Sequence, residues 1–237
     1  MGEYTASLRS VSLLDEATRS AMVGLYLAHY DGSDAATVRA DLSDKNEVLL
    51  LHHHEGLVGF STLEIYERDW CGRRICVVFS GDTVVARPHW GQQTLAVRWI
   101  ERMGELRRER PGLPIYWLLI VKGHRTFKFL PAFARSFFPH WELDRSDLKP
   151  LAEALAREKF GAAYNPTTGC VEPGESRGHV KPEIALPSVQ EQGRAPIQFF
   201  MERNPRYLVG HELVCLCEIA EANMRPMTRR IFARRAS

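Results

Sequence analysis

The stretch FSGDTVVARPHWGQQTL, residues 79–95, decides the fold of this chain. Its first half is an apolar run with Asp82 and two hydroxyl side chains at its centre, and such a run is typical of a β-strand. Pro88 and Gly91 then mark a turn, and the amphipathic residues that follow predict a helix. Because a helix N-terminus presents backbone N–H groups to an anion, this strand, turn and helix together predict a phosphate-binding turn.

The residues before this stretch predict two helices followed by three antiparallel strands. Apolar side chains recur at helical spacing over residues 15–30, and Ser33 and Asp34 cap a second helix that reaches residue 43. The strands are predicted over residues 47–54, 57–66 and 74–86, with tight turns between them.

The residues after the stretch predict a helix over residues 90–110 and then the most apolar strand of the chain, over residues 114–121. An apolar strand that follows an amphipathic helix predicts a parallel crossover, so we expect this strand beside residues 74–86. Residues 124–138 predict an aromatic helix that starts or bends at Pro131.

Beyond residue 138, the pattern predicts a helix over residues 146–159 that Ser146 caps, and a last strand over residues 212–219. Residues 164–194 are rich in Pro and Gly, and they predict a long loop that is either a lid or an insertion. Arginines gather at the C-terminus, where we expect a solvated tail.

The composition is that of a globular protein, with 45% hydrophobic and 25% charged residues among 237. A formal net charge of +2 argues against a nucleic-acid partner, and no apolar run approaches the ~18 residues of a transmembrane segment. The N-terminus lacks the pattern of a signal peptide, and the five cysteines show no Cys-x-x-Cys spacing. We therefore expect a cytoplasmic protein with reduced thiols.

The order of these elements resembles the fold of the GNAT-type (GCN5-related) N-acyltransferase superfamily, of which the chain is identified as a divergent member. The resemblance covers residues 15–138 and the last strand. It implies the class α/β (α+β), a mixed, mostly antiparallel central sheet flanked by helices, with a C-terminal extension. Residues 1–145 are then the acyltransferase core, and residues 146–237 add a helix, the long loop or lid and the final strand to the same domain.

In that family, the turn after the fourth strand binds the pyrophosphate of acyl-CoA through backbone N–H groups. The family motif is Q/R-x-x-G-x-G/A, whereas this chain has Gly91 as its one glycine, followed by two glutamines. The resemblance implies acyl-CoA as co-substrate, or the acyl-phosphopantetheine of an acyl carrier protein, which offers a single phosphate. The candidate carrier-binding residues are Val84, Val85, Arg87, Gly91, Gln92, Gln93, Thr94, Lys122 and Arg125.

Asp82 is the first candidate for catalysis. A carboxylate inside an apolar strand costs free energy unless it is paired, and burial raises the pKa of a carboxyl group toward the range of a general base. The alternative is structural, with Asp82 and Thr83 holding a bulge at Gly81. Without a bulge, Ser80 and Asp82 point to one face of the strand and Thr83 points to the other.

Three further residues are candidates for proton transfer, and each has a plainer alternative. Glu64 lies on the neighbouring strand and is otherwise a solvated side chain. His89 lies in the turn beside the carrier, and Tyr116 opens the apolar strand; the alternatives are a turn histidine in solvent and a core aromatic. Lys122 and Arg125 are likewise solvated charges if they hold no phosphate. His52 and His54 share one face of their strand, but no carboxylate or cysteine accompanies them at ligand spacing, so we expect no metal.

We therefore expect an N-acyltransferase that moves an acyl group from a thioester carrier to a small-molecule amine acceptor by direct attack. A strand N–H near Val85 polarises the carbonyl, and Asp82 or water takes the proton. The alternative is a non-catalytic GNAT-like module that binds an acyl carrier or a partner protein. The single glycine of the turn favours the module, and the polar residues inside the strand favour the enzyme.

Overall fold

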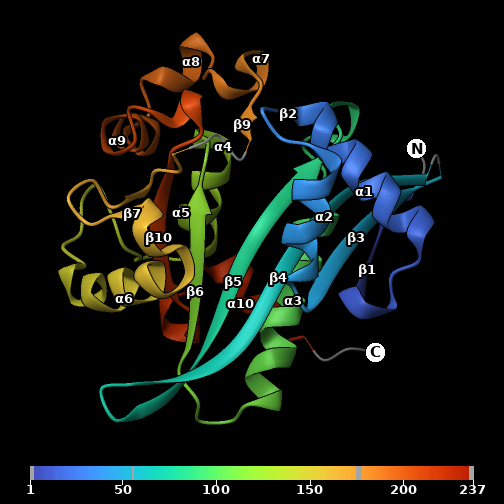
Figure 1. Ribbon diagram of the computed structural model, residues 1–237. Helices are drawn as coiled ribbons and strands as arrows, with labels where there is room; N and C mark the ends of the chain where they lie inside the picture. Colours follow the sequence, from blue (N-terminus) through green and yellow to red (C-terminus); the bar gives the residue numbers. More distant parts are fainter. Residues whose placement is uncertain (1–2, 55, 175–177, 235–237) are drawn as a thin grey trace. The chain divides into compact units, whose positions relative to one another are not determined.

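Figure 1 shows the computed structural model, which describes residues 3–54, 56–174 and 178–234. The chain forms two compact units. The first contains the described parts of Met1–His29, Asp34–Ile115 and Pro226–Ser237, and the second contains Tyr30–Ser33 and the described parts of Tyr116–Arg225. The predicted division of the chain after residue 145 stays a prediction.

The first unit is built on an antiparallel sheet with the strand order β1-β3-β4-β5. These strands are β1 (Thr5–Ser10), β3 (Glu47–His53), β4 (Gly56–Trp70) and β5 (Arg73–Val85). The three central strands were predicted within a few residues of their observed ends. Strand β1 was not predicted, because its six residues include one large apolar side chain and leave no clear alternation.

Helices cover both faces of this sheet (Figure 1). On one face, α1 (Glu16–His29) and α2 (Ala35–Ser43) bury Met22, Val38 and Leu42. Asp34 caps α2 as predicted, by accepting a hydrogen bond from the Thr37 N–H. On the other face lies α3 (Thr94–Glu109), and α10 (Pro226–Phe232) packs against α3.

The start of β6 (Ile115–Val121) lies beside the start of β5 in the first unit. The backbone N–H of Cys76 donates to the carbonyl of Pro114 over 2.8 Å, and Ile115 is fully buried. Helix α3 connects the end of β5 to this point, so the chain returns as the predicted parallel crossover requires.

The second unit has its own antiparallel pairings, in the order β6-β10-β8-β7. Strand β10 (Glu212–Glu218) matches the predicted last strand, and β8 (Cys170–Val171) and β7 (Tyr164–Asn165) extend the pairing. Helix α6 (Lys149–Phe160) packs against β10 and β7, and a separate pair is formed by β2 (Tyr30–Asp31) and β9 (His179–Val180). With mostly antiparallel strands flanked by helices, the predicted class, α/β (α+β), is confirmed.

Three predicted helices differ in their bounds. The helix expected from residue 90 begins at Thr94, because residues 87–89 form a 3-10 turn and Trp90 is extended. The aromatic helix is two short helices, α4 (His124–Phe127) and α5 (Phe129–Phe133). Pro131 fits in the first turn of α5, because a backbone N–H there has no acceptor within the helix and its absence costs no hydrogen bond. Ser146 opens a 3-10 turn, and α6 follows from Lys149.

The segment predicted as a loop over residues 164–194 contains several short elements between its loops. It contributes β7, β8 and β9 and two short helices, α7 (Pro182–Ala185) and α8 (Val189–Gln192), and α9 (Ala195–Arg203) follows it. Elements of two to four residues are too short to leave a periodic signal in a sequence. At the C-terminus, the arginines up to Arg234 are exposed as expected, but the segment is not a loose tail, because α10 buries Ile231 and Phe232.

Candidate functional site

Strand β5 carries a β-bulge at Gly81 and Asp82, opposite the single residue Thr62 of β4. The register on either side of the bulge pairs Ser61 with Thr83 and Leu63 with Ser80. The bulge that was expected as the structural role of this segment is therefore present, at the polar centre of the strand.

The bulge changes which side chains share a face. The hydroxyl oxygens of Ser61 and Thr83 are 2.8 Å apart, and Ser80 points to the same face as Thr83. Asp82 points to the opposite face. The unbulged alternation that paired Ser80 with Asp82 is thus wrong, because the extra residue reverses the order of faces beyond Gly81.

Asp82 lines a small cavity on the face that α1 and α2 cover. The other lining residues are Met22, Val38, Asp41, Leu42, Phe60 and Thr62. The Thr62 hydroxyl is buried and has no hydrogen-bond partner among the described residues. A half-buried carboxylate thus lines a mostly apolar cavity of about 10 Å³, together with the buried Thr62 hydroxyl.

Glu64 lies on the same face of β4 as Thr62, two residues further along the strand. It is half-buried and stands opposite Phe79 of β5. The predicted base Asp82 and its predicted substitute Glu64 therefore share one face of the sheet.

Two aromatic side chains, Trp90 and Tyr4, make hydrogen bonds that hold the turn after β5. The indole N–H of Trp90 donates to the Val85 carbonyl over 2.7 Å, and the Arg87 guanidinium lies 5.9 Å from the centre of the Trp90 ring system. His89 is half-buried, and its Nδ1 is hydrogen-bonded to the Tyr4 hydroxyl at 2.9 Å. His89 is therefore a partnered side chain at the edge of the turn and not a histidine free in solvent.

Three consecutive residues, Gly91, Gln92 and Gln93, shape the backbone at the start of α3. Gly91 has a φ of +90°, a conformation that other residues adopt at a cost. The Gln92 side-chain oxygen accepts from the Leu95 N–H at 3.3 Å, and the Gln93 side chain donates to the Gly91 carbonyl at 3.2 Å. The N–H groups of the first turn, from Thr94 onward, have no intrahelical acceptor and carry the positive end of the helix dipole.

The remaining carrier-binding candidates of the first unit lie at the end of β5. Val84 stands opposite Phe60 and is buried, whereas Val85 stands opposite Gly59 and is half-buried. Both positions are within ten residues of the α3 N-terminus, and their predicted contact with a carrier stays a prediction.

The predicted residues of the second unit are each engaged within that unit. Tyr116 is half-buried and stands opposite Glu218 in β10. The Lys122 ammonium is 3.5 Å from the Glu212 carboxylate and 5.6 Å from the Tyr30 ring centre. The Arg125 Nε donates to the Ile184 carbonyl at 3.3 Å, and its role, like that of the others, stays a prediction.

His124 at the start of α4 lies in the run of residues 122–125 that was expected to offer cationic donors, and it is buried. Its Nδ1–H donates to the Ala185 carbonyl at 3.1 Å, and its Nε2 lies 3.9 Å from the Glu191 carboxylate. Burial lowers the pKa of His124 to about 4, and a hydrogen bond from Lys128 lowers the pKa of Glu191 to about 2. These contacts attach α7 and α8, part of the expected lid, to α4.

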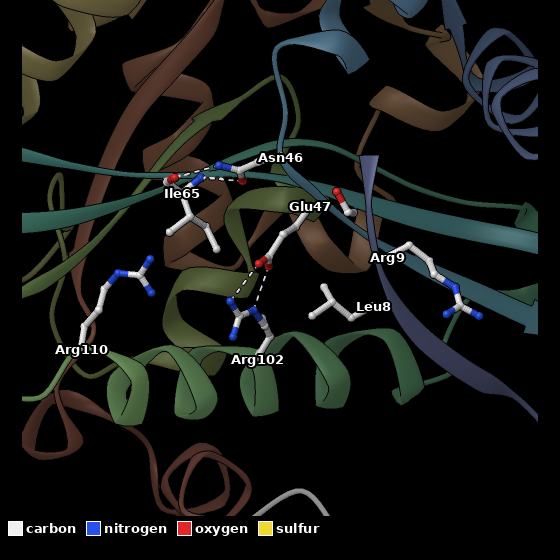
Figure 2. A pocket seen from close by; sticks show the side chains of 8 residues that line it. Leu8, Arg9, Asn46, Glu47, Ile65, Arg102 and Arg110 are labelled. Carbon is white, nitrogen blue, oxygen red and sulfur yellow. Dashed lines mark hydrogen bonds and ion pairs between the residues drawn. The ribbon is translucent and has the colours of Figure 1, made fainter. Parts of the chain in front are cut away.

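Figure 2 shows an open pocket of about 350 Å³ on the α3 face of the first unit. Arg102 is buried there and binds the Glu47 carboxylate through two hydrogen bonds of 2.8 Å, and it also binds Glu109. Burial opposes the charge of Arg102, but these hydrogen bonds raise the pKa of its guanidinium above the usual value. Arg102 is therefore saturated by carboxylates and has little capacity to bind an anion.

Two further findings bear on cofactors and membranes. Among the described residues, no three His, Cys, Asp or Glu side chains are grouped so that they could bind a metal ion. Nor does the described part of the chain contain a helix long and apolar enough to span a membrane.

No protein-family model and no curated protein matches this chain. A probable N-acyltransferase from Enterococcus faecalis V583 is structurally similar, with a TM-score of 0.42 and 11% identity over 56% of this chain and 33% of that chain. The GNAT family N-acetyltransferase YhbS from Escherichia coli, in complex with CoA, has a TM-score of 0.39 and 15% identity over 55% and 69%. A GCN5-related N-acetyltransferase from Kribbella flavida has a TM-score of 0.39 and 17% identity over 55% and 33%.

The match thus spans one third of the length of the first and the third of these proteins. GNAT-type N-acyltransferases are therefore among the solved structures that this chain resembles.

Proposed function

We propose that this protein is an N-acyltransferase that moves an acyl group from a thioester carrier to a small-molecule amine. One observation carries the proposal. Strand β5 leads from a half-buried carboxylate in a bulge, Asp82, through the positive-φ Gly91 to the start of α3. A proton acceptor and an anion-binding helix end thus lie 12 residues apart on one strand–turn–helix segment of the first unit.

The carrier is the phosphate-bearing partner. Backbone N–H groups of the first turn of α3 bind a phosphate group, and Arg87 at the exposed side of the turn adds a positive charge. Gln92 already caps Leu95, so the N–H groups on either side of Leu95 are the ones that remain for a ligand. A CoA pyrophosphate and a single phosphopantetheine phosphate both suit this chemistry.

The reaction is a direct attack. The neutral amine attacks the thioester carbonyl, the N–H proton passes to the Asp82 carboxylate or to water, and the carrier leaves as a thiolate that is then protonated. His89, which lies in the turn of the same unit, is the candidate for protonating the thiolate. No covalent enzyme intermediate and no metal is needed for this sequence of steps.

The test is release of free thiol. The purified protein is incubated with acetyl-CoA, octanoyl-CoA or palmitoyl-CoA and a mixture of primary amines, and thiol is measured together with the mass of any acylated amine. The proposal requires thiol release that depends on the amine and falls in the Asp82→Asn variant. Replacing acyl-CoA by an acyl-loaded carrier protein distinguishes the two donors.

The second candidate is a module that binds an acyl carrier without turnover. The single glycine of the turn favours it, because the other family glycine position is here Gln93. Calorimetric binding of CoA with no amine-dependent thiol release for any donor would establish this alternative and end the proposal of an enzyme.

A further inference from the structure

Lys45 places a buried ammonium group next to the bulge of β5. The residue lies between α2 and β3, and its side chain is 1% exposed. Its Nζ donates to the Asp41 carbonyl at 2.9 Å and to the Asp41 carboxylate at 3.0 Å. The same Nζ lies 5.5 Å from the centre of the Phe79 ring, two residues before Gly81. A lysine this deeply buried is uncommon and needs a reason.

The side chain of Lys45 closes the space beside Gly81. A Cβ added to Gly81 would lie 2.6 Å from the Lys45 Cε and 2.5 Å from the Thr62 hydroxyl oxygen. It would lie 3.6 Å from the Lys45 Nζ. The bulge therefore packs directly against Lys45, and any side chain at its first position must displace Lys45 or Thr62.

The anchor of Lys45 belongs to the same cavity as the proposed base. Asp41, which holds the ammonium, lines this cavity together with Thr62 and Asp82. Lys45 thus touches the bulge on one side and is bonded to a wall of the cavity on the other.

We propose that Lys45 is a positioning residue, which packs against Gly81 and so fixes the bulge that presents Asp82 to the cavity. This role rests on the proposed function, in which Asp82 accepts the proton. Lys45 itself touches neither the acyl group nor the amine. Its effect is on the placement of the carboxylate, so it acts on turnover and not on the binding of the carrier.

The first test is Lys45→Met, which removes the charge and keeps most of the side-chain length. We expect kcat to fall about tenfold or more, since small misplacements of a catalytic group are costly, with KM for acyl-CoA unchanged. The melting temperature should change little, because the Asp41 carboxylate that loses its partner is 50% exposed and stays hydrated. Lys149→Met, which removes an exposed lysine paired with Glu153, is the control and should change neither value.

The second test does not depend on activity. Hydrogen–deuterium exchange of the backbone over residues 79–84 should be faster in Lys45→Met, with exchange in α3 unchanged. If the wild-type protein shows no turnover with any donor, the proposed function fails, while the exchange rates still decide whether Lys45 holds the bulge. Unchanged exchange overturns the proposal, as does faster exchange with an unchanged kcat in an active enzyme.

The third test approaches the same contact from β5. Gly81→Ala should displace Lys45 or Thr62, lower kcat to a similar extent and leave KM for acyl-CoA unchanged. The double variant Lys45→Met/Gly81→Ala should be no less active than the worse single variant, because both changes break one contact. Additive losses would mean that the two residues act separately and would contradict the proposal.

Discussion

Two buried cations lie on opposite faces of the first unit's sheet, and their surroundings differ. Arg102 on the α3 face is bound by Glu47 and Glu109, and a third carboxylate, Glu105, is 3.6 Å away. Lys45 on the α1 and α2 face has Asp41 as its carboxylate partner and packs against a bulge. A cation saturated by carboxylates ties elements together, whereas a cation with one anchor beside a cavity can set the position of another group.

Removing Arg102 should cause the largest change in stability. Arg102→Met leaves Glu47, Glu105 and Glu109 without their shared cation, so we expect a loss of about 3 kcal/mol in the free energy of unfolding. Urea unfolding at pH 7 measures it. The kcat of the folded fraction should stay unchanged, because α3 carries this group on the face away from Asp82. If Lys45→Met destabilises the protein as much as Arg102→Met does, the contrast between the two cations disappears.

Removing the carboxylate at the bulge should cause the largest change in turnover. Asp82→Asn keeps the shape of the side chain and removes the proton acceptor, and we expect kcat to fall about 100-fold or more. Binding of acyl-CoA, measured by calorimetry, should be retained. Glu64→Gln, on the same face of β4, is the matched comparison and should have the smaller effect. Normal turnover by Asp82→Asn would assign the residue to the bulge alone and leave Glu64, His89 or water as the base.

Gly91→Ala should separate strain from ligand binding at the turn. Its φ of +90° means that a side chain adds strain of about 1 kcal/mol even though no atom lies within 4 Å of the added Cβ. Gly112→Ala is matched, with a φ of +78° and equally open space. Both variants should melt at similarly lowered temperatures, and Gly91→Ala alone should weaken acyl-CoA binding. Equal affinities would remove the turn from the carrier site.

The smallest expected effect is a pH dependence on the α3 face. The hydrogen bond from Arg102 holds the pKa of Glu109 below its usual value, so the stability it contributes is present above the unfolded pKa of about 4.3 and is lost as the pH falls through the folded pKa. Urea midpoints of the wild type should therefore fall more steeply below about pH 4.5 than those of Glu109→Gln. Parallel curves would show that Glu109 is not coupled to Arg102.

The sequence predicted the framework of both units better than their details. The helices α1, α2, α3 and α6 and the strands β3 to β6 and β10 were found because each is long enough to show a helical, alternating or continuous apolar pattern. The missed elements are mostly short, namely β1, the paired β7 and β8, and α10, but no helix was predicted for the nine residues of α9 either. The short elements contribute few apolar side chains, so their sequences show no periodic pattern, and they form because they pack or pair with neighbouring elements.

At the candidate site, the sequence by itself determined which groups are unusual. The residue types and their order show a carboxylate, Asp82, inside an apolar strand, then Gly91 at a turn and then a helix. A carboxylate is rare inside a strand because its burial costs free energy, and glycine is common at turns because it adopts a positive φ without strain. The face of each side chain was decided by the tertiary structure. The bulge at Gly81 moves Asp82 away from Ser80, and Lys45, 36 residues earlier in the chain, fills the space beside Gly81. Such a contact between distant residues depends on packing, and no local pattern encodes it.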